Sequence, residues 1–109
     1  QAAADEGILS IGVDSNQNHL HPGKVLTSML KRVDVAVYNS FKAGEALDTT
    51  PQALDLKAEG VGYAMDEHNA ALVTAEMKAA VDAAAEKIKS GELKVHDYMS
   101  DNTCPAATF

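Results

Sequence analysis

An aspartate stands at the end of the first apolar run of the chain, in the stretch SIGVDSNQNHLHPG of residues 10–23. An ionised carboxylate only accepts hydrogen bonds, so Asp14 suits a ligand that offers two hydroxyl groups, such as a ribose or another sugar. Charge-assisted hydrogen bonds of this kind are roughly twice as strong as neutral ones. The alternative is an Asx-turn, in which the side chain merely ends a strand. Residue type and position leave both interpretations open.

Lys31 is the second candidate for ligand contact. It follows the run VLTSML of residues 25–30, so it also lies where a predicted strand ends. A lysine at that point can donate hydrogen bonds to an oxygen or a ring nitrogen of a ligand. The alternative is a solvated residue in the first turn of the helix that follows, which is the usual place for a lysine.

The histidines form no clear metal site. His19 and His21 would share one face of an extended segment, and with Asp14 or His68 they could supply metal ligands. A metal site needs convergent ligands in a defined geometry, and nothing in the spacing fixes the approach of His68. We therefore interpret the histidines as loop residues and predict no metal site.

The remaining reactive residue types do not indicate an enzyme. The serines lack the context of a nucleophile elbow, and Cys104 lies in a tail beside Pro105. The GVGY of residues 60–63 lacks the length and the Lys-Ser/Thr ending of a phosphate-binding loop. Adjacent carboxylates such as Asp66 and Glu67 are interpreted as solvation of a loop. We predict a protein without catalysis and without a cofactor.

The first half of the chain predicts two strands and a helix. Residues 7–14, GILSIGVD, form a short apolar run, which is typical of a strand buried on both faces in a parallel sheet. Residues 25–30 predict a second strand. From Arg32 the apolar residues recur at helical spacing, and Gly44 is the expected C-cap. The predicted apolar stripe of this helix consists of Val33, Ala36, Val37 and Phe41.

The second half predicts a hairpin-like pair, a helix and a strand. Two short strands are expected within residues 53–65, joined around Glu59 and Gly60. The clearest helix follows Thr74 as its N-cap and ends at Gly91. Its predicted buried stripe consists of Met77, Ala80, Val81, Ala84 and Ile88. A last strand is predicted over ELKVHDY, residues 92–98, and a tail over residues 99–109.

Strands that alternate with helices predict an α/β architecture with a largely parallel sheet. In such sheets, ligands bind outside the carboxyl ends of the strands. Asp14 follows the carboxyl end of its predicted strand, which is the position expected for a ligand-binding carboxylate.

Composition excludes several classes of protein. The 109 residues are enough for about one domain, and a net charge of −7 without a basic cluster does not fit a nucleic-acid-binding protein. The single cysteine excludes an intrachain disulfide. The opening QAAADEG resembles the last turns of a helix closed by Gly7, so we expect the chain to be part of a longer protein.

Four stretches together resemble a known family: IGVDSNQ, VLTSMLKRVDVAVYNSFKAG, GVGYAMDEHNAALV and KIKSGELKVHDY. They resemble the carboxy-terminal part of the basic-membrane-protein family of substrate-binding lipoproteins. These proteins are the purine-nucleoside-binding components of ABC importers, and they have the type I periplasmic binding protein fold. The resemblance covers nearly the whole chain.

The resemblance implies an incomplete two-lobed protein whose lobes are joined by hinge crossovers. Residues 1–30 would belong to the second lobe, residues 31–74 mainly to the first lobe, and residues 75–109 to a crossing helix, strand and tail. Asp14 would bind the ribose hydroxyls, Lys31 would donate to the ligand, and Gln17 would line the cleft between the lobes.

The resemblance also implies partners and a location. The base-stacking aromatic residues and the acylated cysteine of the family would lie upstream, in a missing amino-terminal portion of the same protein. The expected partners are a purine nucleoside, this missing portion and an ABC transporter permease. The expected location is the periplasm or the outer face of the cell membrane.

Two other functions stay open at this point. The same fold serves as a ligand-sensing domain of regulators and receptors, where closure drives signalling. An enzyme that uses the histidines and a metal ion is the third possibility, and the residues favour it least.

Overall fold

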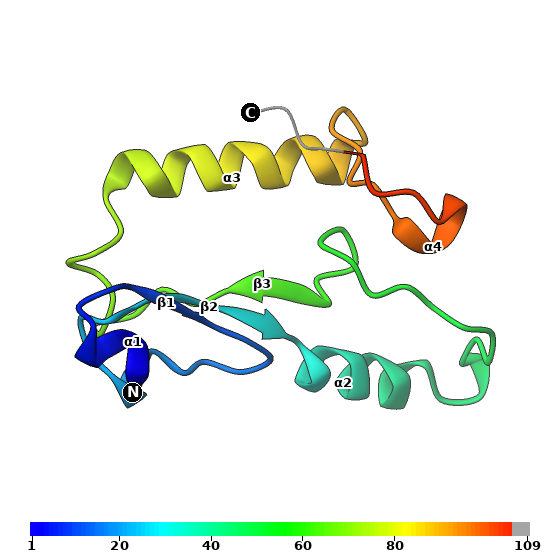
Figure 1. Ribbon diagram of the computed structural model, residues 1–109. Helices are drawn as coiled ribbons and strands as arrows, with labels where there is room; N and C mark the ends of the chain where they lie inside the picture. Colours follow the sequence, from blue (N-terminus) through cyan, green and yellow to red (C-terminus); the bar gives the residue numbers. More distant parts are fainter. Residues whose placement is uncertain (106–109) are drawn as a thin grey trace.

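Three strands form one small sheet in the order β1–β2–β3 (Figure 1). β1 (Ser10–Gly12) pairs in parallel with β2 (Val25–Lys31), and β3 (Val61–Tyr63) pairs antiparallel with the other edge of β2. The computed structural model describes residues 1–105. The predicted α/β architecture is confirmed, with a sheet that is parallel on one side of β2 and antiparallel on the other.

Two helices account for most of the remaining regular structure. α2 (Val33–Ala43) continues from β2, and α3 (Ala75–Ser90) lies as a separate layer above the sheet (Figure 1). The predicted caps are confirmed: Thr74 Oγ1 accepts a hydrogen bond of 3.1 Å from the N–H of Met77, and Gly91 has a left-handed φ of 81°. None of the helices within residues 1–105 is long and apolar enough to cross a membrane.

The remaining elements are short. α1 (Ala2–Asp5) leads into β1, and α4 (Tyr98–Asp101) follows the extended segment after α3. Two 3₁₀ turns, η1 (Asn18–Leu20) and η2 (Gly44–Ala46), lie in the loops after β1 and α2. The end of α1 agrees with the helix end predicted at Gly7, because the N–H of Ile8 bonds to the carbonyl of Ala3 at 3.0 Å.

Two predicted strands are wrong. The segment before Glu59 forms a turn, in which the N–H of Gly60 donates to the carbonyl of Asp55 at 2.9 Å. Residues 92–98 form no ladder within the described part of the chain, and Asp97 instead caps α4 by accepting from the N–H of Met99. A strand needs a neighbouring strand, and local sequence pattern does not reveal whether one is present. Part of the predicted tail, residues 106–109, lies outside the described residues.

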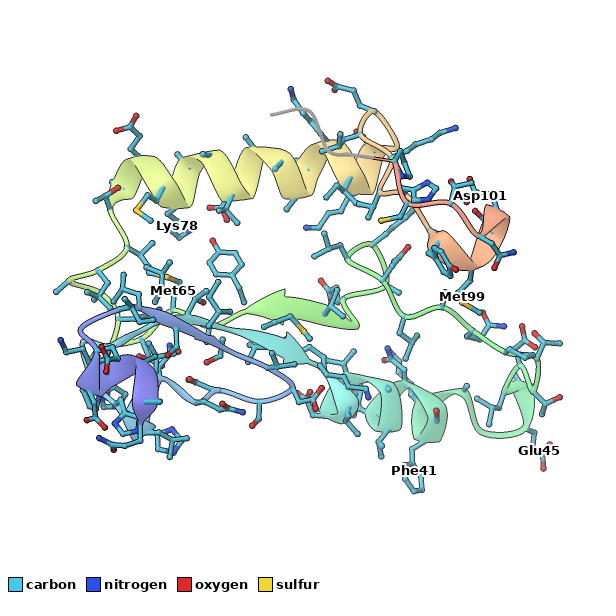
Figure 2. All side chains as sticks on the ribbon, viewed as in Figure 1. Phe41, Glu45, Met65, Lys78, Met99 and Asp101 are labelled. Carbon is cyan, nitrogen blue, oxygen red and sulfur yellow. The ribbon has the colours of Figure 1, made fainter. Side chains whose placement is uncertain are left out.

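The apolar core is small and the largest fully buried side chains are polar. Val25 and Ala64 are the apolar residues buried within residues 1–105, at 5% and 4% exposure. Burial of the first strand on both faces is wrong, because Ile11 is 61% exposed. The predicted α2 stripe also lacks cover, and Figure 2 shows Phe41 pointing away from the sheet. The predicted α3 stripe is not buried either, since Met77 and Val81 are exposed.

The overall dimensions agree with this exposure. The Cα radius of gyration is 16.7 Å, whereas a compact domain of this length has a radius of about 13 Å. The accessible surface is 8458 Å², and a folded monomer of 11.5 kDa exposes about 5,800 Å². The excess of roughly 2,600 Å² on this one chain is larger than the area of about 800 Å² that each partner buries in a standard protein–protein interface. The fold therefore leaves apolar faces of β1 and α2 available for contact.

Candidate functional site

The predicted ligand residues Asp14 and Lys31 are neighbours in the structure. The N–H of Lys31 donates to the carbonyl of Asp14 at 2.8 Å, so the ends of the adjacent parallel strands β1 and β2 are joined here. Both residues are exposed. Asp14 has a φ of 74°, a left-handed conformation that aspartate adopts more readily than most residues. The backbone thus brings the two residues together, and their role as ligand contacts stays a prediction.

Lys31 lines a cavity of about 200 Å³ at the start of α2. Arg32, Leu54 and Gly60 are among the other residues of its wall, and Asp14 is not. Arg32 and Val61 also line a larger cavity of about 590 Å³ between β3 and α3. Several polar groups of that larger cavity are paired with one another, because Tyr63 donates to Asp82 at 2.6 Å and Lys89 forms an ion pair of 2.9 Å with Glu86.

The side chain of Gln17 forms its hydrogen bond within its own loop. Its side-chain Nε2 donates to the carbonyl of Val13 at 2.9 Å, and its backbone N–H donates to Ser28 Oγ at 3.0 Å. The side chain is half-buried and closes the turn between β1 and η1. These bonds define how Gln17 is held, and its contact with a ligand stays a prediction.

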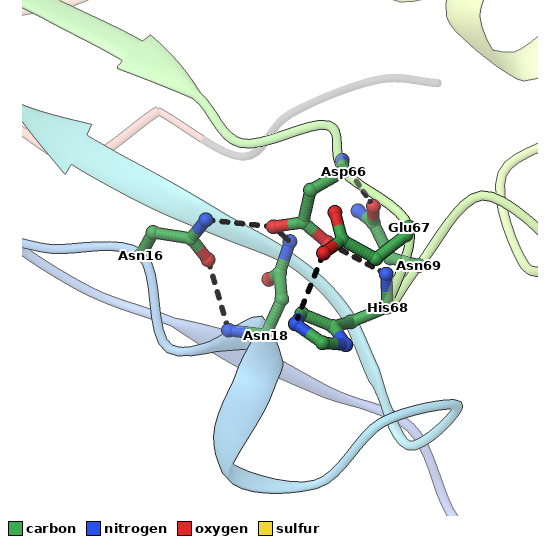
Figure 3. A network of polar contacts seen from close by, with 6 residues as sticks. All are labelled: Asn16, Asn18, Asp66, Glu67, His68 and Asn69. Atoms are coloured by element: carbon green, nitrogen blue, oxygen red, sulfur yellow. Dashed lines mark hydrogen bonds and ion pairs between the residues drawn. The ribbon is translucent and has the colours of Figure 1, made fainter.

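A polar network joins the loop after β1 to the loop after β3 (Figure 3). Asn16 Nδ2 and Asn18 Nδ2 both donate to Asp66 Oδ2, at 2.7 Å and 3.1 Å. Asn18 is fully buried, and its Oδ1 accepts from Ser28 Oγ at 2.8 Å. One carboxylate oxygen of Asp66 therefore holds two side chains that lie 50 and 48 positions before it in the chain.

Asp66 is itself fixed to the sheet. Its N–H donates to Asn69 Oδ1 at 2.9 Å, and its Oδ1 accepts from the N–H of His68 at 2.9 Å. Asn69 is fully buried, and its Nδ2 donates to the carbonyls of Leu26 and Ala64 at 2.8 Å and 3.0 Å. The bond from Asn16 is the main cause that holds the pKa of Asp66 below its ordinary value.

The interpretation of Asp66 as simple loop solvation is therefore wrong. Its main partners lie in a different loop, so no local pattern around residue 66 identifies them. The crowding of amide side chains in SNQN, directly after Asp14, was the available signal for a hydrogen-bonded loop.

The same region holds a group of possible metal ligands, Asp66, Glu67 and His68, whose ligand atoms lie within 4.8 Å of one another. Both oxygens of Asp66 already accept hydrogen bonds, and His68 Nε2 lies 3.8 Å from Glu67 Oε1. The arrangement is explained by the turn that Asp66 organises. His19 and His21, which the sequence offered as ligands, are not part of this group.

No family model and no curated protein matches the sequence. One of the matching solved structures is the crystal structure of ABC transporter system solute-binding proteins from Aeropyrum pernix K1. The two chains are 25% identical and superpose with a TM-score of 0.63 over 85% of this chain. The matched region covers 34% of the other chain, so this chain spans about a third of that protein's length. The likeness confirms the prediction of a binding-protein-like α/β fold.

Proposed function

We propose that the chain is part of a substrate-binding component of an ABC importer, and that it binds a purine nucleoside or a related small molecule without catalysis. The observation that carries this proposal is the structural likeness to solute-binding proteins of an ABC transporter system. The sequence resemblance to the basic-membrane-protein family supports the choice of a nucleoside as ligand.

The ends of β1 and β2 are the proposed point of contact with the ligand. A carboxylate at Asp14 accepts from ribose hydroxyls, while the Lys31 ammonium donates to an acceptor on the same ligand. Their backbones are already joined by the bond of 2.8 Å, so little rearrangement is needed to present both groups together. Gln17, on the same loop, is the third proposed contact.

The remainder of the binding site comes from another part of the same protein in this proposal. Residues 1–30 belong to one lobe, residues 31–74 mainly to the other, and residues 75–109 cross between them. Closure of the lobes favours ligand binding only through contacts that are stronger in the closed state. The exposed apolar faces of β1 and α2 are then covered by the amino-terminal portion. The partner in transport is a permease at the outer face of the membrane, where a lipid anchor upstream of this sequence holds the protein.

Isothermal titration calorimetry of the full-length protein with guanosine tests the proposal. We expect Asp14→Asn to weaken binding by on the order of 1–3 kcal/mol, because the ribose hydroxyls lose an ionised acceptor. Asparagine tolerates the left-handed φ of this position, so the fold is retained. Glu6→Gln, an exposed carboxylate at the end of α1, is the matched control and should leave affinity unchanged. Unchanged guanosine affinity in Asp14→Asn would refute the assignment of Asp14.

A further inference from the structure

The loop between β1 and η1 carries two of the proposed ligand residues, yet most of it lies on the surface. Val13, Asp14, Ser15 and Asn16 are all exposed. An exposed loop with few apolar contacts opens readily, so its conformation depends on the hydrogen bonds that hold it. Besides the backbone bond from Lys31 to Asp14, the bonds that join this loop to the strands and to the loop after β3 within residues 1–105 run through Ser28 and Asp66.

The path from Asp66 to the sheet is continuous. The amide of Asn69 is fixed by the carbonyls of Leu26 and Ala64, and Asn69 Oδ1 accepts from the N–H of Asp66. Asp66 in turn receives the side chains of Asn16 and Asn18 on one oxygen. Figure 3 shows the carboxylate lying between the two loops, with both asparagines directed at it. Buried amides and hydrogen bonds to a charged acceptor make this a well-fixed support.

We infer that Asp66 is a positioning residue, which holds the loop of residues 13–18 in the conformation that presents Asp14 and Gln17 to the ligand. The inference rests on the proposed function, because the loop conformation matters for binding only if these two residues contact the ligand. Holding a binding loop in its bound conformation lowers the entropy lost on binding.

Asparagine at position 66 has the same shape but the wrong hydrogen-bonding groups. Asp66 accepts on both oxygens: Oδ1 faces the N–H of His68, and Oδ2 faces the amides of Asn16 and Asn18. An asparagine replaces one of these acceptors with an NH₂ group, so a donor faces a donor on one side or the other. Asp66→Asn is therefore a minimal change that disturbs the support without leaving a cavity.

Amide hydrogen exchange of the full-length protein, followed by NMR, tests the anchoring directly. In Asp66→Asn we expect the exchange rates of the Gln17 and Asn18 amides to rise roughly tenfold, while the amides of β2 keep their wild-type rates. Glu67→Gln is the matched control, because Glu67 is the adjacent carboxylate, is exposed and, among residues 1–105, pairs only with His68. It should leave all these rates unchanged. Unchanged Gln17 and Asn18 rates in Asp66→Asn would overturn the inference.

Swapping the side chains of residues 16 and 66 distinguishes a positioning role of Asp66 from a general loss of stability. In the double variant Asn16→Asp/Asp66→Asn, the new carboxylate lies on the loop and the amide of residue 66 can donate to it. The Nδ2 of Asn18 still faces the new amide group of residue 66, so we expect this variant to recover only part of the slow exchange at Gln17. If Asp66→Asn fails to fold, Asn16→Ala is the second variant, because it removes the exposed donor to Asp66 and should also accelerate exchange at Gln17. It also removes the Oδ1 that accepts from the N–H of Asn18 at 3.0 Å, so Gln17 alone is the readout for this variant.

Guanosine titration of the same variants links the anchoring to binding. We expect roughly tenfold weaker affinity in Asp66→Asn, partial recovery in the double variant, and no change in Glu67→Gln. If the wild type does not bind guanosine, the proposed nucleoside ligand is rejected. Faster exchange in Asp66→Asn would then still support the structural role of Asp66. Loss of anchoring with unchanged guanosine affinity would overturn the inference that the anchor serves binding.

Discussion

The N–H of Lys31 and the carbonyl of Asp14 lie 2.8 Å apart, and this bond extends the pairing of β1 and β2 beyond the end of the regular ladder. Register pairs Gly12 of β1 with Ser28 of β2, and Asp14 and Lys31 follow this pair by two and three residues. A carboxylate and an ammonium group are thereby presented at the carboxyl end of a parallel strand pair, where α/β proteins bind ligands.

The left-handed conformation of Asp14 predicts that stability and binding respond in opposite directions. Its φ is 74°, which glycine adopts without strain. We expect Asp14→Gly to raise the free energy of unfolding by up to about 1 kcal/mol, while it weakens guanosine binding by removing the carboxylate. Chemical unfolding and calorimetry of the full-length protein measure the two effects.

Glu59 provides the control for this prediction, because it also has a positive φ, of 58°, in the separate turn before β3. Glu59→Gly should give a similar gain in stability with unchanged affinity. A loss of stability in Asp14→Gly would show that the carboxylate contributes more to the fold than the backbone strain costs.

Acid should weaken the contact that Asp66 makes between the loop after β1 and the loop after β3. Hydrogen bonds to its carboxylate, first from Asn16, lower the pKa of Asp66 in the folded state. The stabilisation is therefore fully present above the ordinary aspartate pKa of about 3.9, and it is lost as the pH falls through the lower pKa of the folded state. We expect the wild type to be more stable than Asp66→Asn at pH 7, with the difference shrinking below about pH 4.

Urea unfolding of both proteins at several pH values measures this difference. The comparison is needed because the pKa values of Asp34, Asp48 and Asp82 are also lowered, so acid destabilises both proteins through these groups. A constant difference between the two proteins from pH 7 to pH 3 would contradict the assignment to Asp66.

Elements defined by local chemistry could be predicted from the sequence. Thr74 and Gly91 bound α3 because a side-chain oxygen and a left-handed glycine act within one turn of the helix. Gly44 ends α2 with a positive φ of 54°, which glycine adopts without strain, and β2 follows its compact apolar run. The proximity of Asp14 and Lys31 also follows from strand ends, since parallel neighbours end at the same edge of a sheet.

Features that depend on distant residues could not be predicted in this way. The pairing of Asn16 with Asp66 spans 50 positions, and neither residue carries a local sign of the other. Residues 92–98 alternate like a strand but have no strand beside them in the described part of the chain. Ile11 lies in an apolar run that predicts burial, yet its cover is not supplied by residues 1–105.

The proposal that residues 1–109 are part of a longer protein predicts that, with their apolar faces exposed, they behave differently alone and within that full-length protein. Ile11 of β1 and Phe41 of α2 lie on faces that the rest of residues 1–105 does not cover. We expect the isolated polypeptide to bind an apolar dye such as anilinonaphthalene sulfonate and to self-associate in size-exclusion chromatography. The full-length protein should do neither. A monodisperse monomer with one cooperative unfolding transition and no dye binding would contradict this prediction.

One hydrogen bond should hold α3 over the sheet. The hydroxyl of Tyr63 donates to Asp82 Oδ1 at 2.6 Å, and the same aspartate pairs with Lys78. The bond to Asp82 is the main cause that raises the pKa of Tyr63. We expect Tyr63→Phe to reduce the free energy of unfolding by about 1–2 kcal/mol, because Asp82 loses its only described bond to the sheet.

Limited proteolysis should also cut Tyr63→Phe faster in the segment after α3, and urea unfolding gives the stability change directly. Tyr38→Phe is the matched control, since Tyr38 is exposed on α2 and forms no side-chain hydrogen bond to the described residues. Equal effects of the two substitutions would show that the Tyr63 hydroxyl does not hold α3.

Two nearby glycines predict opposite responses to the same substitution. A Cβ at buried Gly60 would overlap the backbone carbonyl of Leu54, and this backbone cannot move freely because Gly60 bonds to both Asp55 and Arg32. We expect Gly60→Ala to cost about 1–3 kcal/mol of stability. A Cβ at Gly62, in β3, meets no atom within 4 Å, so Gly62→Ala should raise stability by about 0.4–1 kcal/mol through the unfolded state. Thermal unfolding of both variants distinguishes them, and a stable Gly60→Ala protein would mean that the turn before β3 does not pack against Leu54 as described.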